Sequence, residues 1–236
     1  MGDVDYEATG EGYARHRRTD PRIAALVWEA LGDTETVINV GAGAGSYEPE
    51  DRYVIAVEPS AAMRAQRRTP AVDATAESLP FDDDSFDVAM AMVTIHQWRD
   101  VDRGLRELRR VSRGPVVILT FEGGAVPRFW LNDYAPDVLA LEASRYPPLA
   151  SLGGRVVEVP IPFDCQDGFA EAFYGRPEAL LDPEVRRAQS AWGLAGVDDV
   201  PALRDALASG EWDARYGHLR TQPEYVGSLR LVVTES

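Results

Sequence analysis

The sequence contains no lysine: each of its 24 Lys and Arg positions is an arginine. This absence excludes three kinds of site that need an ε-amino group, namely a Schiff base, a phosphate-binding P-loop and a lysine general base. Cysteine is nearly absent too, because Cys165 is the single one, which excludes an internal disulfide framework. Cys165 also has no companion ligands nearby, so we predict a packed thiol and no metal site.

The chain also lacks long apolar runs and a positive net charge. No apolar stretch approaches 18 residues, and the acidic start, Met1–Glu7, has no apolar region of the kind found in secretory signals. The formal net charge of −15 disfavours nucleic acid, because phosphate contacts depend on Lys and Arg. We therefore expect a cytoplasmic protein with a small-molecule substrate and no nucleic-acid or membrane partner; the oligomeric state stays open.

An apolar run that ends in alternate glycines is the most informative pattern present. Residues 37–40 precede Gly41–Gly45, which has glycine at every second position, and a second apolar run, residues 54–57, ends in Glu58. This pattern is typical of two strands of a Rossmann-type sheet, one followed by a glycine turn and the other by an acid. Glycine lets backbone N–H groups approach a ligand, and the carboxylate can accept hydrogen bonds from both ribose hydroxyls. We predict a nucleoside-binding site.

The spacing favours a nucleoside without phosphates. The glycines read G-x-G-x-G instead of the dinucleotide fingerprint G-x-G-x-x-G, and Glu58 follows Gly45 by 13 positions. That span contains Pro49 and three acidic residues, which excludes a long helix and would repel a pyrophosphate. The predicted cofactor is S-adenosylmethionine, with S-adenosylhomocysteine as product. A nicotinamide-dependent oxidoreductase on the same sheet is the alternative.

Further blocks, in order along the chain, resemble the type 11 class I methyltransferases, the group that contains the ubiquinone and menaquinone biosynthesis C-methyltransferases. The resemblance covers residues 36 to about 120, whereas the start and the last 110 residues match only loosely. The blocks are the glycine motif, Val57–Ser60 with Met63, Ala76–Phe81, Ser85–Val88 running on to His96–Trp98, and Leu105–Val111.

The resemblance implies an α/β fold: a Rossmann-like, seven-stranded, mostly parallel sheet with an antiparallel last strand and helices on both faces. Apolar patterning places strands at 36–40, 53–57, 71–74, 86–91, 115–120, 155–160 and 228–234, and helices at 21–31, about 60–67 and 99–111. We expect one methyltransferase domain over 1–236. Its parts are an N-terminal helical segment, 1–35, and a cofactor-binding core, 36–122.

About 60 residues separate the last two expected strands. Residues 162–224 are rich in Pro, Asp and aromatic residues and look helical in pieces, at Pro177–Leu181, Pro183–Trp192 and Val200–Ala208. An insertion at this edge lies near the carboxyl rim of the sheet, where substrates bind. We interpret it as a helical lid; a packing embellishment or a dimer surface is the alternative.

The resemblance also implies which residues bind the cofactor. In the family, the residue at the position of Met63 packs on the adenine, and the segment that corresponds to Thr75–Glu77 contacts the adenine ring. The residue at the position of Arg17 pairs with the cofactor carboxylate. Arg17 follows Tyr13 by four positions, which places both on one helical face. Asn39 and Thr75 stand where the family usually has Asp, which removes a charge at each place. The predicted set is Tyr13, Arg17, Gly41, Ala42, Gly43, Glu58, Pro59, Met63, Thr75, Ala76 and Glu77.

His96 follows the fourth expected strand, at the rim where the sulfonium methyl should point. An unperturbed imidazole pKa of about 6.5 makes it a usable base at neutral pH. The alternative is that His96 only hydrogen-bonds a helix start and touches no substrate. We expect Trp98, Trp130 and Tyr134 to line the substrate pocket. The aromatic residues of the variable region are candidates for its apolar walls and favour an aromatic or polyketide-like acceptor, methylated on O, N or C; they are Trp130, Tyr134, Tyr146, Phe169, Phe173 and Tyr174. The alternative is a protein of this fold that binds the cofactor without methyl transfer.

Overall fold

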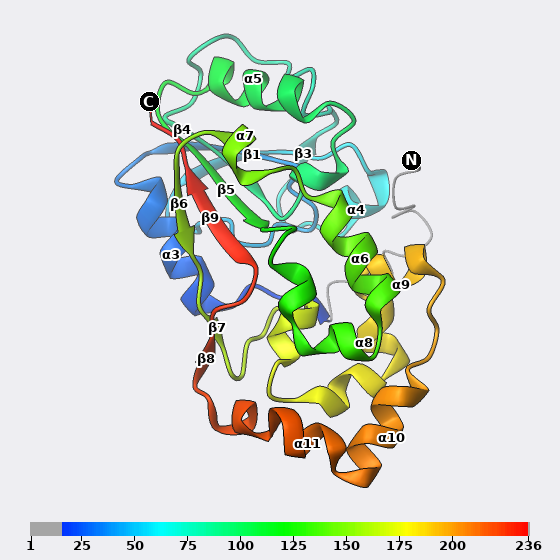
Figure 1. Cartoon of the computed structure of the whole chain (residues 1–236). Coiled ribbons are helices and arrows are strands. Elements are labelled where there is room, and N and C mark those ends of the chain that lie inside the picture. The colour runs from blue at the N-terminus through cyan, green and yellow to red at the C-terminus, as the bar shows by residue number, and fades with distance from the viewer. Residues whose placement is uncertain (1–15, 236) are drawn as a thin grey trace.

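The centre of the molecule is a seven-stranded β-sheet, seen in the computed structural model of Figure 1, which describes residues 16–235. The order across the sheet is β3-β2-β1-β4-β5-β9-β6. β4 and β5 are buried at every position, as expected for central strands covered on both faces. The strands are β1 (Thr36–Val40), β2 (Tyr53–Val57), β3 (Ala71–Val72), β4 (Val88–Met92), β5 (Val116–Phe121), β6 (Arg155–Glu158) and β9 (Leu229–Val233).

The direction of β9 is opposite to that of the other six strands of this sheet. β1, β2, β3, β4 and β5 pair in parallel, whereas β9 pairs antiparallel with β5 on one side and with β6 on the other. In Figure 1 the red β9 lies between β5 and β6. The predicted fold class, a Rossmann-like, mostly parallel sheet with an antiparallel last strand, is therefore confirmed.

Helices α3 (Pro21–Leu31) and α5 (Val101–Val111) cover opposite faces of the sheet. The apolar side of α3 packs in one core cluster with Val37, and that of α5 packs in a second cluster with Ile38. Because successive side chains of a strand point to opposite faces, the two clusters form the two layers of the core. Asp20 caps α3 and Asp100 caps α5, each by accepting a backbone N–H with its side chain.

Between β5 and β6 the chain leaves the sheet and returns to it. This segment contributes one wall of the site described below. Its elements are η2 (Val126–Arg128), η3 (Trp130–Asp133), α6 (Pro136–Arg145) and α7 (Leu149–Leu152).

The seventy residues between β6 and β9, 159–228, form what we call the insertion. The pair β7–β8 ties its two ends together, and its buried aromatic residues belong to the same core cluster as α3. In Figure 1 it lies below the sheet, with α10 and α11 farthest away. Whether it acts as a lid stays a prediction. Its elements are β7 (Ile161–Pro162), η4 (Ala170–Phe173), η5 (Pro177–Leu181), α8 (Pro183–Arg187), α9 (Ser190–Ala195), α10 (Pro201–Ser209), α11 (Glu211–Tyr216), η6 (Gly217–Thr221) and β8 (Glu224–Tyr225).

The helix predicted over Pro183–Trp192 is instead two helices, α8 and α9. The backbone is extended at Gln189 (φ −120°, ψ 112°), whose side chain donates to Val185 O (3.1 Å) and accepts from Trp192 Nε1 (3.2 Å). These side-chain bonds hold the break between the two helices. The third strand is also shorter than predicted, and the sequence did not predict α11 or the pair β7–β8.

A buried carboxylate at the base of the insertion makes stability depend on pH. Glu171 is 5% exposed and accepts hydrogen bonds from the Ser228 backbone N–H (3.1 and 2.9 Å) and Oγ (2.9 Å). Burial raises its pKa to about 7, although these bonds and Arg230 act in the opposite direction. The contribution of Glu171 to stability is therefore complete below its unfolded pKa of 4.5 and is lost as the pH rises through about 7.

Glu171→Gln removes this titration. As the pH is raised from about 4.5 to about 8, the wild-type free energy of unfolding should fall relative to that of the variant, by up to about 3 kcal/mol. Urea denaturation across this range measures the difference. Glu184→Gln, at an exposed position of α8, is the control and should show no such trend. A difference between wild type and Glu171→Gln that stays constant with pH would contradict the prediction.

Candidate active site

The glycine turn lies at the carboxyl end of β1. Gly41 has a φ of 70°, and a Cβ built there would lie 2.1 Å from Thr94 Oγ1, so the position requires glycine. The N–H groups of Gly41 and Ala42 both donate to Val57 O (2.9 and 3.0 Å). The loop is thus held against the end of β2.

Glu58, directly after β2, holds the same loop through its side chain. Its Oε2 accepts the N–H of Gly43 and its Oε1 accepts the N–H of Ser60, both at 2.8 Å. Ser60 in turn caps α4 (Ala61–Ala65). Each carboxylate oxygen has a further lone pair, so Glu58 can also accept hydrogen bonds from a ligand.

A cavity of about 620 Å³, measured with its opening to solvent, lies at this edge of the sheet; we call it the loop cavity. It brings together residues from the N-terminal segment, the glycine turn, Glu58 and the insertion. Six of its residues belong to the predicted cofactor set: Arg17, Gly41, Ala42, Gly43, Glu58 and Met63. Eight further residues line it: Ala44, Ser46, Tyr47, Met92, Val93, Thr94, Gln97 and Asp167.

The remaining members of the predicted set do not line this cavity, and Tyr13 lies outside the described residues. Glu77 Oε1 accepts the N–H groups of Arg99 (2.8 Å) and Asp100 (3.1 Å), so its side chain fixes the start of α5. Ala76 is buried in the core cluster on the α5 side. The role of Pro59 and of Thr75–Glu77 in cofactor binding stays a prediction.

Asp167 is a residue of the loop cavity that the sequence did not single out. Its Oδ1 accepts from Arg17 Nε at 2.5 Å, and its Oδ2 accepts from the Tyr47 hydroxyl at 2.8 Å. The carboxylate is buried, so an ion pair from two distant segments forms part of the cavity wall. No local signal marks Asp167, because its partners lie 120 and 150 positions away.

Asn39, at the place where the resembled family usually has Asp, donates a hydrogen bond to a carboxylate. Its Nδ2 donates to Glu48 Oε1 (2.9 Å), and Arg67 Nη2 donates to both oxygens of that carboxylate (2.8 Å each). Asn39 Oδ1 is buried and meets no partner among residues 16–235. A carboxylate therefore stands next to Asn39 although the position itself has lost its charge.

These groups fit S-adenosylmethionine. Glu58 suits a ribose, the Met63 thioether suits an aromatic ring, and the Arg17–Asp167 pair matches the carboxylate and ammonium of an amino acid. The turn at Gly41 leaves no space for a side chain, because Thr94 packs directly against the backbone there.

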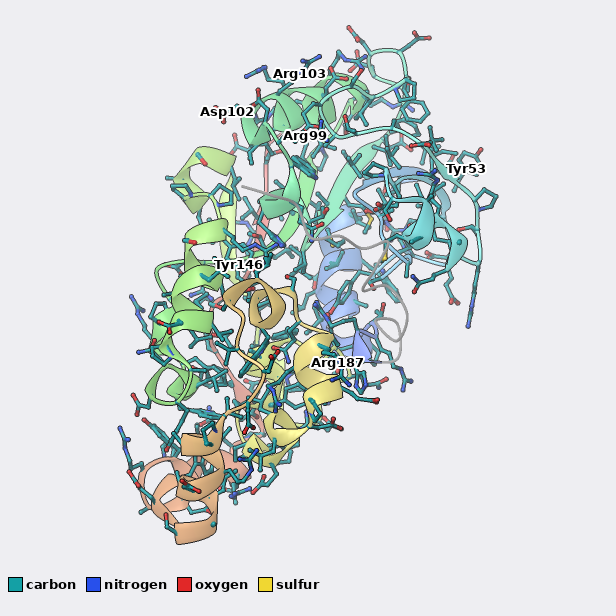
Figure 2. All side chains as sticks on the ribbon, turned by 90° about the vertical axis from the view of Figure 1, so that its right-hand side faces the viewer. Tyr53, Arg99, Asp102, Arg103, Tyr146 and Arg187 are labelled. Carbon is teal, nitrogen blue, oxygen red and sulfur yellow. The ribbon has the colours of Figure 1, made fainter. Side chains whose placement is uncertain are left out.

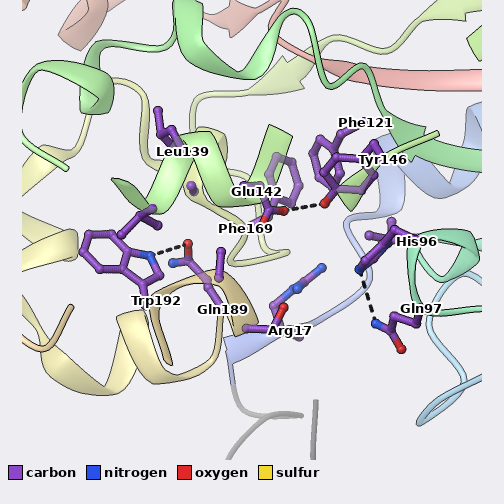
Figure 3. A pocket seen from close by; sticks show the side chains of 15 residues that line it. Arg17, His96, Gln97, Phe121, Leu139, Glu142, Tyr146, Phe169, Gln189 and Trp192 are labelled. Atoms are coloured by element: carbon purple, nitrogen blue, oxygen red, sulfur yellow. Dashed lines mark hydrogen bonds between the residues drawn. The ribbon is translucent and has the colours of Figure 1, made fainter. Parts of the chain in front are cut away.

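A second cavity, of about 550 Å³ with its opening, adjoins the first; we call it the aromatic cavity (Figure 3). It shares Arg17, Val93 and Gln97 with the loop cavity. Its walls come from the sheet rim, from α6 and from the insertion. The lining residues are Arg17, Val93, His96, Gln97, Phe121, Val138, Leu139, Glu142, Tyr146, Phe169, Ala170, Gln189, Ser190, Ala191 and Trp192.

His96, in η1 (Ile95–Gln97), lies in this wall with its ring centroid 4.9 Å from that of Tyr146. Its Nε2 lies 3.4 Å from Gln97 Nε2, and its Nδ1 is buried without a partner in the described part of the chain. Burial lowers the His96 pKa to about 3, and the positive charges of Arg145 and Arg17 add to the effect. The imidazole is therefore neutral at physiological pH and a weaker base than the sequence suggests.

Tyr146 and Glu142 form a hydrogen-bonded pair in the same cavity. The Tyr146 hydroxyl donates to Glu142 Oε1 in a short contact, and burial, with the Glu142 charge, raises the Tyr146 pKa well above 10. The sequence suggested Tyr146 and Phe169 as pocket aromatics but did not suggest Glu142. Glu142 lies on α6 four positions before Tyr146, which directly follows the helix, and this spacing was the available signal.

Trp98, Trp130 and Tyr134, predicted to line the substrate pocket, lie outside both cavities. Trp98 packs on Gly104 of α5, where a Cβ would lie 2.4 Å from its ring. Trp130 is 5% exposed, donates to Tyr174 O (2.9 Å) and packs on Trp212, and Tyr134 packs on Trp130. These rings pack in or against the core, and their role in substrate binding stays a prediction.

Two features are absent from the described part of the chain. Within residues 16–235, no three His, Cys, Asp or Glu side chains are grouped so that they could hold a metal ion. In the same range, no helix is both long enough and apolar enough to span a membrane.

Comparison with known proteins agrees with this geometry. The family model described as "Methyltransferase domain" matches residues 38–118. The malonyl-[acyl-carrier protein] O-methyltransferase of Halorhodospira halophila is 30% identical, over 97% of this chain and 92% of that protein. A 2-methyl-6-phytyl-1,4-hydroquinone methyltransferase of Spinacia oleracea is 28% identical over 53% of this chain and 40% of its own length.

A solved structure is similar over almost its whole length. It is described as a methyltransferase from an antibiotic biosynthesis pathway of Anabaena variabilis, with a TM-score of 0.85, 29% identity, and coverage of 94% of this chain and 99% of that chain. The similarity thus extends beyond the sheet to the insertion. With the site geometry, these relationships show that the chain belongs to the class I S-adenosylmethionine-dependent methyltransferases of type 11.

Proposed function

We propose that S-adenosylmethionine occupies the loop cavity and that its methyl group passes to a small acceptor in the aromatic cavity. The observation that carries this proposal is the common wall of the two cavities, formed by Arg17, Val93 and Gln97. Val93, at the end of β4, has a φ of 52°, a strained conformation for a β-branched residue. Such strain at the junction supports its assignment as the place of reaction.

Binding and alignment are the main tasks of the protein in this reaction. Glu58 would accept from the ribose hydroxyls, Met63 would pack on the adenine, and the Arg17–Asp167 pair would hold the amino-acid end. The cofactor supplies an already activated methyl group when bound. In-line placement of the acceptor atom at about 3 Å then provides most of the rate enhancement.

The aromatic cavity suits a flat, mostly apolar acceptor. Phe121 lies between Tyr146 and Phe169, with centroid distances of 5.4 and 5.3 Å, and aliphatic residues of α6 and Trp192 complete the walls. An aromatic or polyketide-like metabolite fits these walls. The names of two relatives, which concern a hydroquinone and an antibiotic pathway, support this acceptor class.

His96 would meet the acceptor in this arrangement. Its buried Nδ1 lacks a protein partner among the described residues, and its ring lies in the aromatic wall. The role of general base, which the sequence predicted for His96, remains a proposal. Because its pKa is low, His96 is better suited to hydrogen-bond the acceptor than to take its proton.

Loss of the Glu58 carboxylate should weaken cofactor binding. Glu58→Ala removes hydrogen bonds to a charged acceptor, each worth about 1.5–3 kcal/mol, so the affinity for S-adenosylhomocysteine should fall about tenfold or more. Calorimetric titration gives the dissociation constant, and circular dichroism shows whether the fold survives. Glu50→Ala, an exposed acid between the same strands, should bind like wild type. A folded Glu58→Ala variant with unchanged affinity would refute the assignment of the ribose site.

Methyl transfer is tested directly with S-adenosylmethionine labelled on its methyl carbon. The protein is incubated with a panel of hydroxylated aromatic compounds, with carboxylic acids and amines, and with metabolite extract of the source cells. We expect label in an extracted apolar product, because the aromatic cavity selects such compounds. Binding of S-adenosylhomocysteine without label in any product would favour the alternative, a cofactor-binding protein without transferase activity.

A further inference from the structure

Besides His96, two groups in the aromatic cavity can accept a proton: Glu142 on α6 and Tyr146 directly after it. Figure 2 shows Tyr146 near the middle of the molecule, on the segment that follows α6, and Figure 3 shows Glu142 and Tyr146 joined across the pocket from Gln97. The Tyr146 hydroxyl donates its proton to Glu142, so the Tyr146 oxygen still has lone pairs for a donor from the ligand. Neither residue is assigned a function by the glycine motif or by the blocks of the sequence resemblance.

The charges around the cavity are balanced. Arg17 is paired with Asp167 at 2.5 Å, and Arg145 lies 3.8 Å from Glu142 and donates to Ser190 Oγ at 2.7 Å. His96 is neutral, so the part of the cavity that the structure describes offers a carboxylate acceptor no positive charge beyond those already matched by Asp167 and Glu142. An acceptor without charge avoids repulsion by Glu142.

His96 is arranged as a donor. The Gln97 amide nitrogen lies 3.4 Å from His96 Nε2, and because an amide nitrogen can only donate, this contact favours the tautomer with its proton on Nδ1. Nδ1 is buried and has no partner among residues 16–235. A second proton on this ring would be a buried charge close to two arginines. The contacts therefore suit His96 to hold the acceptor oxygen and not to remove its proton.

We propose that the acceptor is a neutral hydroxyl compound, a phenol or an enol, and that Glu142 takes its proton through the hydroxyl of Tyr146. This inference rests on the proposed function. As the acceptor oxygen forms a bond to the methyl carbon, the bond from that carbon to sulfur breaks and its electron pair stays on sulfur. The acceptor proton passes to the Tyr146 oxygen while the Tyr146 proton passes to Glu142. The products are a methyl ether, a neutral thioether and a neutral Glu142.

The test compares methylation rates for a series of substituted phenols of increasing acidity. Glu142→Gln should lower turnover of the least acidic phenols by about 10²-fold, and the loss should shrink as the phenol becomes more acidic, because an ionised phenol needs no base. Tyr146→Phe should show the same trend. Both variants should bind S-adenosylhomocysteine within about twofold of wild type. Asp137→Asn, at an exposed position of the same helix, is the control.

His96→Asn separates the two proton routes. We expect His96→Asn to lower turnover less than Glu142→Gln does, and by a factor that does not depend on the acidity of the phenol. The proposal would be overturned if the loss of turnover in His96→Asn depended on phenol acidity while the loss in Glu142→Gln was the same for every phenol. It would also be overturned if the wild-type protein methylated carboxylic acids or amines but no hydroxyl compound. Absence of transfer to every acceptor class would instead count against the proposed function itself.

Discussion

The ion pair between Asp167 and Arg17 is the contact on which the geometry of both cavities depends. It joins the insertion to the N-terminal segment, the Tyr47 hydroxyl adds the glycine loop, and the Gly168 N–H donates to His16 O (2.9 Å) beside it. Arg17 lies in the wall of both cavities, so a shift of this ion pair would change the shape of both. A buried ion pair adds little net stability because desolvation offsets the attraction, yet loss of one partner leaves a buried charge and is strongly destabilising. Its contribution is to fix the relative position of three distant segments.

Other buried arginines of this acidic, lysine-free chain also have hydrogen-bond partners. Arg67 binds Glu48 through one nitrogen and the carbonyls of Ala42 and Gly43 through another, which supports the glycine loop from beneath. Arg186 is 4% exposed, donates to Leu180 O and Asp198 O, and lies 5.7 Å from the ring centroid of Trp192. A planar guanidinium serves several acceptors and stacks on an aromatic ring at once, which a lysine ammonium cannot do. The arginines thus act as internal cross-links between loops.

Local patterns predicted the part of the site in which neighbours in sequence are neighbours in space. The glycine turn and Glu58 were predictable because each follows directly on an apolar run, and parallel strands bring their carboxyl ends to one edge. The aromatic cavity was not predictable in the same way. An aromatic residue fits a core as well as a pocket: Trp130 and Tyr146 both pack in one core cluster, and nothing local showed that Tyr146 also lines the aromatic cavity whereas Trp130 does not. Asp167 contacts its partners only through tertiary packing. The break at Gln189 depends on side-chain bonds that helix propensity does not describe.

The position of β9 has a consequence for how the protein is made. β5 and β6 do not pair with each other, and the gap between them is filled by a strand that follows seventy residues after β6. β5 is buried at every position in the folded protein. During synthesis on the ribosome, its edge stays unpaired for several seconds at typical elongation rates, until β9 has been made. An unpaired apolar edge is a template for aggregation. For this topology the growing chain, before the sheet closes, is the stage most in need of chaperone protection.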